Sequence, residues 1–407
     1  MVRDFAEKLS VLVLKKGIAL RRNQSLHIVV GPKSYEYAEV MAEEAYRLGA
    51  KYVYIEVLDP RVSAARANYQ DDENLSFVPS YIKNFQYEMI SEDWARIRID
   101  SGEDRVGKIE EDRRKAQIIT KAIRQIGKEY SERTMRSELA WNVCAVPGPL
   151  WAKEILGDDA SEKDLADILS RIYRFDRDDF IKAWDDFDKK ACSLSDKLNS
   201  IGIQMLHYKS PVTDFRIGFR KEARFSGGAG TLADGTKFFA NLPTEEIFSS
   251  PDMFTAEGYI TTTKPVTVMN QKTENVTLFF EKGRVVDVKA KTGLDIMKTF
   301  LDTDEGSRRI GECALVSASS PISRCGISFG SILIDENASC HIALGASYPE
   351  CLTVGSKLRT DEEMHSYGLN TSLVHVDFMV GSPDLDIDAY AYDGKIIPIM
   401  RKGEFTL

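Results

Sequence analysis

The sequence predicts an α/β protein of two domains. We expect an N-terminal domain with a largely parallel sheet and flanking helices, and a C-terminal domain of the β-rich α+β type. Three observations predict this: a strand–helix–strand pattern opens the chain, a glycine-rich stretch interrupts it near residue 230, and closely spaced strand patterns follow. A chain of 407 residues is also too long for one ordinary hydrophobic core. The expected domains are residues 1–230 and 236–407.

The first 60 residues carry the strand–helix–strand pattern. Residues 4–20 place apolar side chains at helical spacing, and residues 26–30 and 51–57 are apolar enough for strands. Between these strands, Ser34 is a candidate N-cap of a helix that ends at Gly49. Two strands joined by a helix are usually parallel neighbours, so the sheet of this domain should be largely parallel.

The middle of the chain adds helices and then changes composition. Residues 110–140 and 160–198 have helical spacing, and residues 141–146 between them resemble a strand. The clearest change is at Ser226-Gly-Gly-Ala-Gly230 and continues to Gly235, where we place the domain junction.

Strand patterns dominate after residue 236. They occur at residues 259–264, 276–280 and 284–288, and the last two are joined by the turn Glu281-Lys-Gly283. A short helix is expected at residues 295–303. Candidate functional residues therefore lie on or beside strands, which can hold several side chains in fixed positions.

Composition excludes several classes of protein. A net charge of −9 without a long basic cluster argues against nucleic-acid binding. No apolar run reaches the ~18–20 residues of a membrane span, and the N-terminus lacks an export signal, so we expect a cytoplasmic protein. Six cysteines without a Cys-x-x-Cys pair do not form a disulfide scaffold.

A group of acidic residues and histidines near the C-terminus carries the functional information. The chain has five histidines, and two of them belong to this group. Its members are Glu246, Glu312, His341, His375 and Asp377.

His375 and Asp377 are two residues apart in a segment that is rich in β-branched and apolar residues. Side chains alternate along a strand, so this imidazole and this carboxylate share one face. Such a pair can be two ligands of one divalent metal, or simply two hydrogen-bonded side chains. Spacing alone leaves both interpretations open. If Cys313 and Cys340 also lie on strands, they point away from the neighbouring Glu312 and His341 and are small buried residues.

The motifs around these residues occur in one order along the chain. They are Asn241-Leu-Pro-Thr-Glu-Glu-Ile-Phe248, Gly311-Glu-Cys-Ala-Leu-Val316, Ser320-Pro-Ile322, Asp335-Glu-Asn-Ala-Ser-Cys-His-Ile-Ala-Leu-Gly345 and His375-Val-Asp-Phe-Met-Val-Gly-Ser382. This set resembles the aminopeptidase T and aminopeptidase S family of dinuclear metalloaminopeptidases. The resemblance is strong from about residue 240 onward and looser in the N-terminal half.

The resemblance implies a set of metal ligands and an activity. The ligands it implies are Glu246, Glu312, His341, His375 and Asp377, with Tyr348 beside the metals. Three carboxylates and two imidazoles exceed the needs of one catalytic zinc and suit two ions ~3.5–4 Å apart, bridged by one carboxylate. Mixed nitrogen and oxygen ligands suit Zn²⁺, Co²⁺ or Mn²⁺.

Three residues are candidates for catalysis. Glu312 would act as both a ligand and a catalytic carboxylate. Tyr348 could contact a metal or stabilise an oxyanion, and Glu245, beside Glu246, could act as a supporting or general-base carboxylate. His207 and His365 lie outside the motifs and are expected to be structural or exposed.

We therefore expect residues 236–407 to form the catalytic metal-binding domain of a metal-dependent aminopeptidase. Its partners would be peptides with a free N-terminus, and the resemblance implies a homodimer. The alternative is a mononuclear iron dioxygenase that opens a dihydroxypyridine ring, because relatives of the fold resemble such enzymes. That chemistry needs two histidines and one carboxylate, so the presence of both Glu246 and Glu312 favours two metals.

Overall fold

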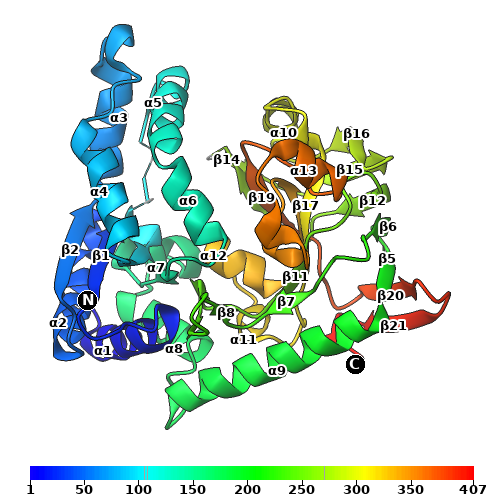
Figure 1. Ribbon diagram of the computed structural model, residues 1–407, viewed down its shortest axis with the longest axis horizontal. Coiled ribbons are helices and arrows are strands. Elements are labelled where there is room, and N and C mark those ends of the chain that lie inside the picture. The colour runs from blue at the N-terminus through cyan, green and yellow to red at the C-terminus, as the bar shows by residue number, and fades with distance from the viewer. Residues whose placement is uncertain (105, 108, 270) are drawn as a thin grey trace. The chain divides into compact units, whose positions relative to one another are not determined.

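The computed structural model describes residues 1–407 except 105, 108 and 270, and it divides into two compact units (Figure 1). The N-terminal unit comprises Met1–Trp184 and Ala229–Pro243. The C-terminal unit comprises Asp185–Gly228 and Thr244–Leu407. An α/β fold with a parallel N-terminal sheet and a β-rich C-terminal part is confirmed.

The bounds of the units differ from the predicted domains 1–230 and 236–407. Strands β5 (Ile203–Ser210) and β6 (Thr213–Gly218) lie before the glycine-rich stretch, yet they pair within the C-terminal unit. Strand β10 (Asn241–Leu242) lies after that stretch but pairs with β4 of the N-terminal unit. Strand pairing therefore decides the division. The chain crosses between the units at Gly228/Ala229, inside the glycine-rich stretch, and also after Trp184 and after Pro243.

The N-terminal unit is built on a five-stranded sheet in the order β10-β4-β3-β1-β2, and its pairs are parallel. The remaining strands are β1 (Ser25–Val30), β2 (Tyr52–Val57), β3 (Ala95–Asp100) and β4 (Trp141–Ala145). A separate two-stranded pair joins β8 (Gly230–Thr231) and β9 (Lys237–Phe238). Strand β1 is buried along its whole length, as expected for the centre of a parallel sheet.

Helices of this part of the chain follow the predicted order with two local corrections. The expected helix 4–20 is α1 (Arg3–Leu12), followed by a π-helical turn from Val13 to Gly17. Ser34 does not cap α2 (Tyr35–Arg47) with its side chain, because its Oγ donates to Oδ2 of Asp104. The other helices are α3 (Pro60–Tyr69), α4 (Ser80–Ser91), α5 (Arg113–Ile126), α6 (Lys128–Met135), α7 (Pro149–Leu156), α8 (Glu162–Ile172) and α9 (Phe180–Ile201).

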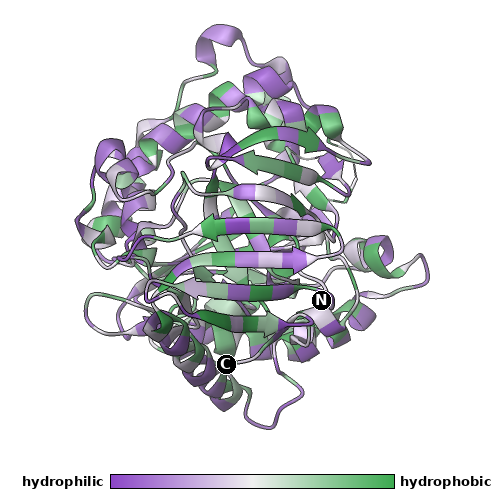
Figure 2. Cartoon of the chain, turned by 90° about the vertical axis from the view of Figure 1, so that its right-hand side faces the viewer, coloured by the Kyte–Doolittle hydropathy of each residue, from purple (hydrophilic) through white to green (hydrophobic). Residues whose placement is uncertain are grey.

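The larger sheet of the C-terminal unit has eight strands in the order β16-β15-β12-β6-β5-β20-β21-β22. Hydrophobic and hydrophilic residues alternate along its strands in Figure 2, as they do in an antiparallel sheet with one face against a core. The predicted hairpin turn is confirmed at Lys282 and Gly283, which both have positive φ. The remaining bounds are β12 (Glu257–Thr261), β15 (Thr277–Glu281), β16 (Arg284–Lys289), β20 (Asp386–Ala391), β21 (Ile396–Arg401) and β22 (Glu404–Phe405).

A second, five-stranded antiparallel sheet of this unit carries the candidate ligands. Its order is β19-β18-β17-β11-β7, with β7 (Ser226–Gly227), β11 (Ile247–Ser249), β17 (Ile310–Leu315), β18 (His341–Gly345) and β19 (His375–Met379). The unit also contains β13 (Val266–Val268), β14 (Gln271–Thr273), α10 (Leu294–Leu301), α11 (Pro321–Arg324), α12 (Ile332–Asp335) and α13 (Asp361–Ser366).

One face of this second sheet joins the main hydrophobic core of the unit. Cys313, Ile342 and Phe378 belong to that core, and each lies next in sequence to a residue of the opposite face. Cys340 is also in the core, where its thiol contacts the backbone of Val316. The prediction that Cys313 and Cys340 are buried, inert residues is in agreement with these positions.

Gly311 allows strands β17 and β18 to lie close together, because it has no side chain. The pairing register shifts between Ile310 and Glu312, so Gly311 is the extra residue of a β-bulge. A Cβ at this position would lie 2.2 Å from the carbonyl oxygen of Ala346 and 2.3 Å from that of Gly345. Because both atoms belong to the backbone, a side chain here would push the strands apart.

We predict that Gly311→Ala lowers the free energy of unfolding by about 1–3 kcal/mol, because it overpacks a rigid strand contact. Urea denaturation followed by circular dichroism measures the change. Gly127→Ala is the matched control, since its φ is −80° and the nearest atom to a new Cβ is a movable side-chain nitrogen of Gln86 at 3.2 Å. Equal stability of the Gly311 variant and wild type would contradict this account of the bulge.

Candidate metal site

Strand register brings four of the five predicted ligands together on one face of the second sheet. Ala343 of β18 is paired with Glu312 on one side and with Asp377 on the other. Gly345, two residues further along β18, is paired with His375. Paired residues share a face, so His341, Ala343 and Gly345 form a row with ligands on both sides. Ala343 has only a methyl group and Gly345 has no side chain. The longer side chains of the proposed ligands therefore have room to converge above the row.

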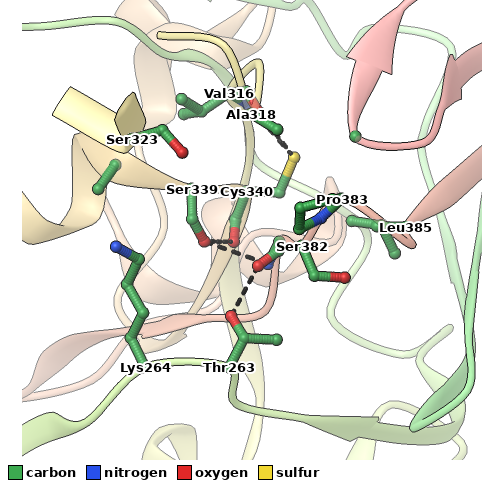
Figure 3. Close-up of a pocket in the computed structure, with 13 residues that line it drawn as sticks. Thr263, Lys264, Val316, Ala318, Ser323, Ser339, Cys340, Ser382, Pro383 and Leu385 are labelled. Atoms are coloured by element: carbon green, nitrogen blue, oxygen red, sulfur yellow. Dashed lines mark hydrogen bonds between the residues drawn. The ribbon is translucent and has the colours of Figure 1, made fainter. Parts of the chain in front are cut away.

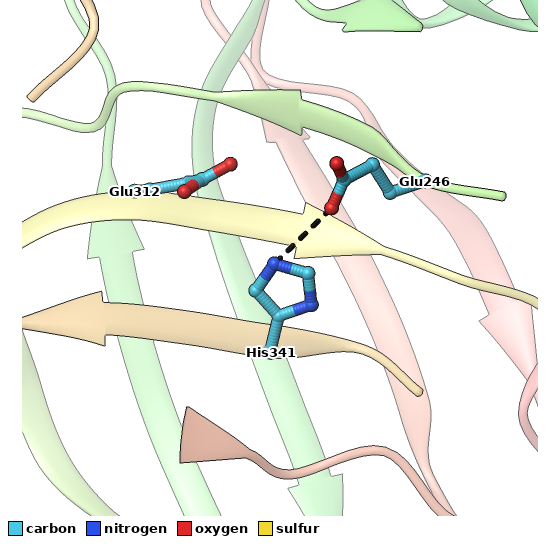
Figure 4. Close-up of side chains that lie close together, drawn as sticks. All are labelled: Glu246, Glu312 and His341. Carbon is cyan, nitrogen blue, oxygen red and sulfur yellow. Dashed lines mark ion pairs between the residues drawn. The ribbon is translucent and has the colours of Figure 1, made fainter. Parts of the chain in front are cut away.

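Glu246 approaches from the next strand. It immediately precedes β11, whose Phe248 is paired with Ala314 of β17. The carboxylate of Glu246 reaches His341, and Figure 4 shows Glu246, Glu312 and His341 pointing toward one another.

The converging side chains form two groups that could each hold a cation. Glu246, Glu312 and His341 form one group, and Glu312, His375 and Asp377 form the other. Within each group, possible ligand atoms lie within 4.8 Å of one another. Glu312 belongs to both groups, so its carboxylate is placed between them. Sequence reasoning expected a bridging carboxylate of this kind.

Hydrogen bonds fix the orientation of both imidazoles. Nδ1 of His341 lies 3.2 Å from the carbonyl oxygen of Ser339, and Nδ1 of His375 lies 2.7 Å from that of Ala346. Carbonyl oxygens only accept, so each Nδ1 carries a proton, and Nε2 of each ring is the atom left to face the carboxylates or to bind a metal. This arrangement is typical of histidines that bind metals through Nε2.

Each Nε2 faces carboxylate oxygens. Nε2 of His341 lies 3.3 Å from Oε2 of Glu246, and Nε2 of His375 lies 3.1 Å from Oε2 of Glu312. Oδ1 of Asp377 is buried and accepts no hydrogen bond from the described residues. It lies 3.5 Å and 3.9 Å from the Nε2 atoms of His375 and His341. Nε2 atoms that face several carboxylate oxygens favour positive charge between them, which a proton on the imidazole or a bound cation can supply, so the donor set fits divalent metal ions.

The electrostatic field of the buried carboxylates also favours positive charge at the two histidines. Burial opposes a charge on His341, but the carboxylates of Glu246, Asp377 and Glu312 outweigh it and raise the pKa of this histidine to about 10. Burial opposes a charge on His375 as well, and Asp377 and Glu312 nevertheless hold its pKa well above the usual value. Burial raises the pKa of Glu312, with His375 acting against it. The cluster thus stabilises positive charge wherever it is placed.

Solvent reaches the cluster from one side. The side chains of Glu312, His341 and Asp377 are at most 8% exposed, whereas those of Glu246 and His375 are 12% and 23% exposed. A substrate would therefore approach along Glu246 and His375.

Tyr348 lies beside His375, one of the proposed ligands. Its Oη is 3.5 Å from Nε2 of His375, and the two rings make an edge-to-face contact with centroids 5.0 Å apart. Its backbone N–H donates to Oγ of Ser250, which fixes the start of the tyrosine side chain. Burial, together with the carboxylates beginning with Glu312, raises the pKa of Tyr348 well above its usual value, so the phenol keeps its proton.

Glu245 is in neither group of possible ligands. Its backbone N–H donates to Oδ1 of Asn337, which ties the segment before β11 to the turn before β18. The structure therefore places Glu245 as a neighbour of the cluster, and its catalytic role stays a prediction.

Sequence reasoning missed Glu336. Burial and the charges of Asp377 and Glu246 raise its pKa well above the usual value, so its carboxyl group lies close enough to the cluster to interact with Asp377. Glu336 lies in a 3-10 turn from Glu336 to Ala338, where side chains do not alternate as they do on a strand. The available signal was a second acidic residue in the segment that leads to His341.

The remaining histidines are separate from the cluster. Nε2 of His365 lies 2.9 Å from Oγ1 of Thr371, and Nε2 of His207 lies 2.6 Å from Oδ1 of Asp214. His27 belongs to the N-terminal unit, where its Nε2 lies 2.9 Å from Oε2 of Glu56. Within the described residues, no helix is long and apolar enough to cross a membrane.

Comparison with known proteins agrees with the motif resemblance. The chain is 34% identical to aminopeptidase 2 of Geobacillus stearothermophilus, over 98% of this chain and 97% of that protein. It is 32% identical to aminopeptidase PepS of Streptococcus thermophilus, over 100% and 98%. Among solved structures, wild-type AmpT from Thermus thermophilus matches with a TM-score of 0.89 and 29% identity, covering 100% of both chains.

A second solved structure shows how far the fold extends. The 2,5-dihydroxypyridine dioxygenase of Pseudomonas putida KT2440 matches with a TM-score of 0.53 and 13% identity, over 99% of this chain and 96% of that one. A likeness at this level concerns the fold alone, and it does not favour the dioxygenase alternative. The sequence model described as thermophilic metalloprotease (M29), by contrast, matches residues 3–405, and the chain belongs to this family of metalloproteases.

Proposed function

We propose that this protein is an aminopeptidase that removes N-terminal residues from peptides and uses two divalent metal ions. The observation that carries the proposal is the pair of ligand groups that share Glu312. Glu246 and His341 would hold one ion, His375 and Asp377 the other, and Glu312 would bind both. Two such ions supply a nucleophilic water at neutral pH and polarise the scissile carbonyl. Zn²⁺, Co²⁺ and Mn²⁺ suit these donors.

The residues of the site have distinct tasks in this proposal. Carbonyl oxygens of Ser339 and Ala346 hold the two imidazoles with Nε2 toward the carboxylates. Tyr348 keeps its phenolic proton and can donate a hydrogen bond to the oxyanion that forms on the scissile carbonyl. The more exposed Glu246 adds negative charge where a substrate's α-ammonium group would enter.

Glu336 and Glu245 are supporting carboxylates in the proposal. Glu336 interacts with Asp377 and would fix the direction in which that ligand points. Glu245 would act through the segment it anchors to Asn337. We also propose a cytoplasmic location, as expected from the sequence, and a homodimer, as the motif resemblance implies; analytical ultracentrifugation measures the latter.

Replacing single histidines tests which of them are metal ligands. His341→Gln and His375→Gln should each lower the metal bound per chain and reduce kcat by about 100-fold or more, because an imidazole leaves the ligand set. His365→Gln is the matched control, since its ring bonds Thr371 outside both ligand groups. Elemental analysis and peptide hydrolysis are measured on the same preparations, before and after EDTA treatment. Full activity after exhaustive EDTA dialysis, or metal loss in the control alone, would refute the assignment.

A substitution at Ala343 tests the position of the metal site without changing any proposed ligand. Ala343→Leu should fill the space between Glu312 and Asp377, which are its partners on both sides. We expect a loss of bound metal with Glu, Asp and His residues unchanged, while Ala343→Gly should retain metal because it only removes a methyl group. Metal content per folded chain is the measurement. Wild-type metal content in the leucine variant would show that the ions bind elsewhere.

The substrate's free amine provides a second functional test. If the carboxylates of the site receive an α-ammonium group, N-acetylated peptides should resist hydrolysis while the free peptides lose one residue at a time. Mass spectrometry of the products follows both reactions. Comparable cleavage of acetylated and free peptides would identify an endopeptidase instead.

A further inference from the structure

The C-terminal unit contains a cavity of about 240 Å³ that none of the proposed metal ligands lines. Lys264, Ser323, Ser339 and Ser382 are among the residues that line it, and Figure 3 shows the Lys264 side chain extending toward this space. Lys264 follows strand β12 and is partly exposed. The cavity is thus reached by one cationic side chain and several hydroxyl groups.

The ammonium group of Lys264 has no carboxylate partner within the described part of the chain. Asp335 is close enough for their charges to interact, but its Oδ1 instead accepts a hydrogen bond from the backbone N–H of Phe329 at 2.8 Å. An ammonium group that faces a cavity and is held in no ion pair within the described residues favours the binding of an anion.

Hydroxyl groups of the cavity add neutral donors. Oγ of Ser382 accepts from the backbone N–H of Asp384, and within the described residues its own proton has no acceptor. The hydroxyl of Ser323 has no side-chain hydrogen-bond partner in the same described set. One positive charge with two available hydroxyl protons suits a monoanion such as a carboxylate.

The cavity also adjoins a proposed metal ligand. Ser339 lines the cavity and accepts a backbone hydrogen bond from Gly381 through its Oγ. Its carbonyl oxygen accepts from Nδ1 of His341. Ser339 therefore connects the lining of the cavity with the histidine that it orients.

We propose that this cavity is a binding site for the carboxylate of an amino acid or of a peptide C-terminus, with Lys264 as its counter-ion and Ser323 and Ser382 as hydrogen-bond donors. The volume is below the ~300–1,000 Å³ of clefts that enclose a whole ligand, so it suits a chain end and not an entire peptide. Identification of the carboxylate as that of a peptide or amino acid rests on the proposed aminopeptidase function.

The first experiment asks whether the carboxylate belongs to the substrate. Hydrolysis of Leu-Gly-Gly is compared with that of its C-terminal amide, and the ratio of their kcat/KM values is measured. Wild-type protein should prefer the free acid, and Lys264→Met should lower the acid-to-amide ratio about tenfold, the worth of one charge-assisted hydrogen bond. Lys264→Arg should retain the preference. Lys298→Met, at an exposed position of α10, is the matched control.

The second experiment asks whether the cavity takes a separate small molecule, and it does not depend on catalysis. N-acetylleucine should raise the Tm of the metal-loaded wild type, N-acetylleucinamide should not, and Lys264→Met should abolish the shift. Inorganic phosphate is run in parallel as another anion.

The outcomes separate this proposal from the proposed function. A lysine-dependent acid preference assigns the cavity to the peptide C-terminus, and a lysine-dependent Tm shift assigns it to a free amino acid or similar carboxylate. No lysine dependence in either experiment, or a shift with phosphate alone, overturns the carboxylate site. Metal-dependent hydrolysis of leucine p-nitroanilide, which has no carboxylate, would remain as separate support for the aminopeptidase.

Discussion

Negative charge gathered on one face of a β-sheet is the constraint on which this structure depends. Glu246, Glu312 and Asp377 converge there, while two backbone carbonyls take the N–H groups of His341 and His375. Each imidazole therefore turns its Nε2 toward the carboxylates at the centre of the cluster. Buried groups of this kind are costly unless a cation compensates them. Metal binding is thus part of the electrostatic balance of the C-terminal unit.

Small residues make this convergence possible. Ala343 and Gly345 occupy the middle strand, Ala314 the next one, and each is paired with a residue that carries or neighbours a ligand. The opposite face of the same strands is apolar and belongs to the core, which holds the backbone in place. A packed core on one face and ligands on the other is how a sheet fixes several side chains within fractions of an ångström.

Much of this could be predicted from the sequence because it depends on strand alternation. The shared face of His375 and Asp377, the inward position of Cys313 and the hairpin at Lys282 all follow from local pattern. Alternation also explains the failures. Glu336 lies in a helical turn, where neighbouring side chains spread around an axis, so its approach to Asp377 could not be derived from spacing.

The division of the chain shows a different limit. The glycine-rich stretch near residue 230 predicted a junction, yet residues 241–242 return to pair with β4 and residues 203–218 pair with later strands. A glycine-rich composition indicates a locally flexible backbone. A compact unit is defined by pairing between strands far apart in the sequence, which a short segment of sequence cannot reveal.

Similarity of fold alone would allow either a dioxygenase or a metalloprotease. The metal-binding side chains distinguish between these two reactions. A dioxygenase shares the fold at 13% identity, so the arrangement of sheets does not select a reaction. A single catalytic iron in that chemistry needs two histidines, one carboxylate and open positions. Here Glu312 belongs to two groups at once, and each group has one histidine and a further carboxylate of its own. This donor set is larger than the dioxygenase chemistry needs, and it agrees with membership of a family of metalloproteases.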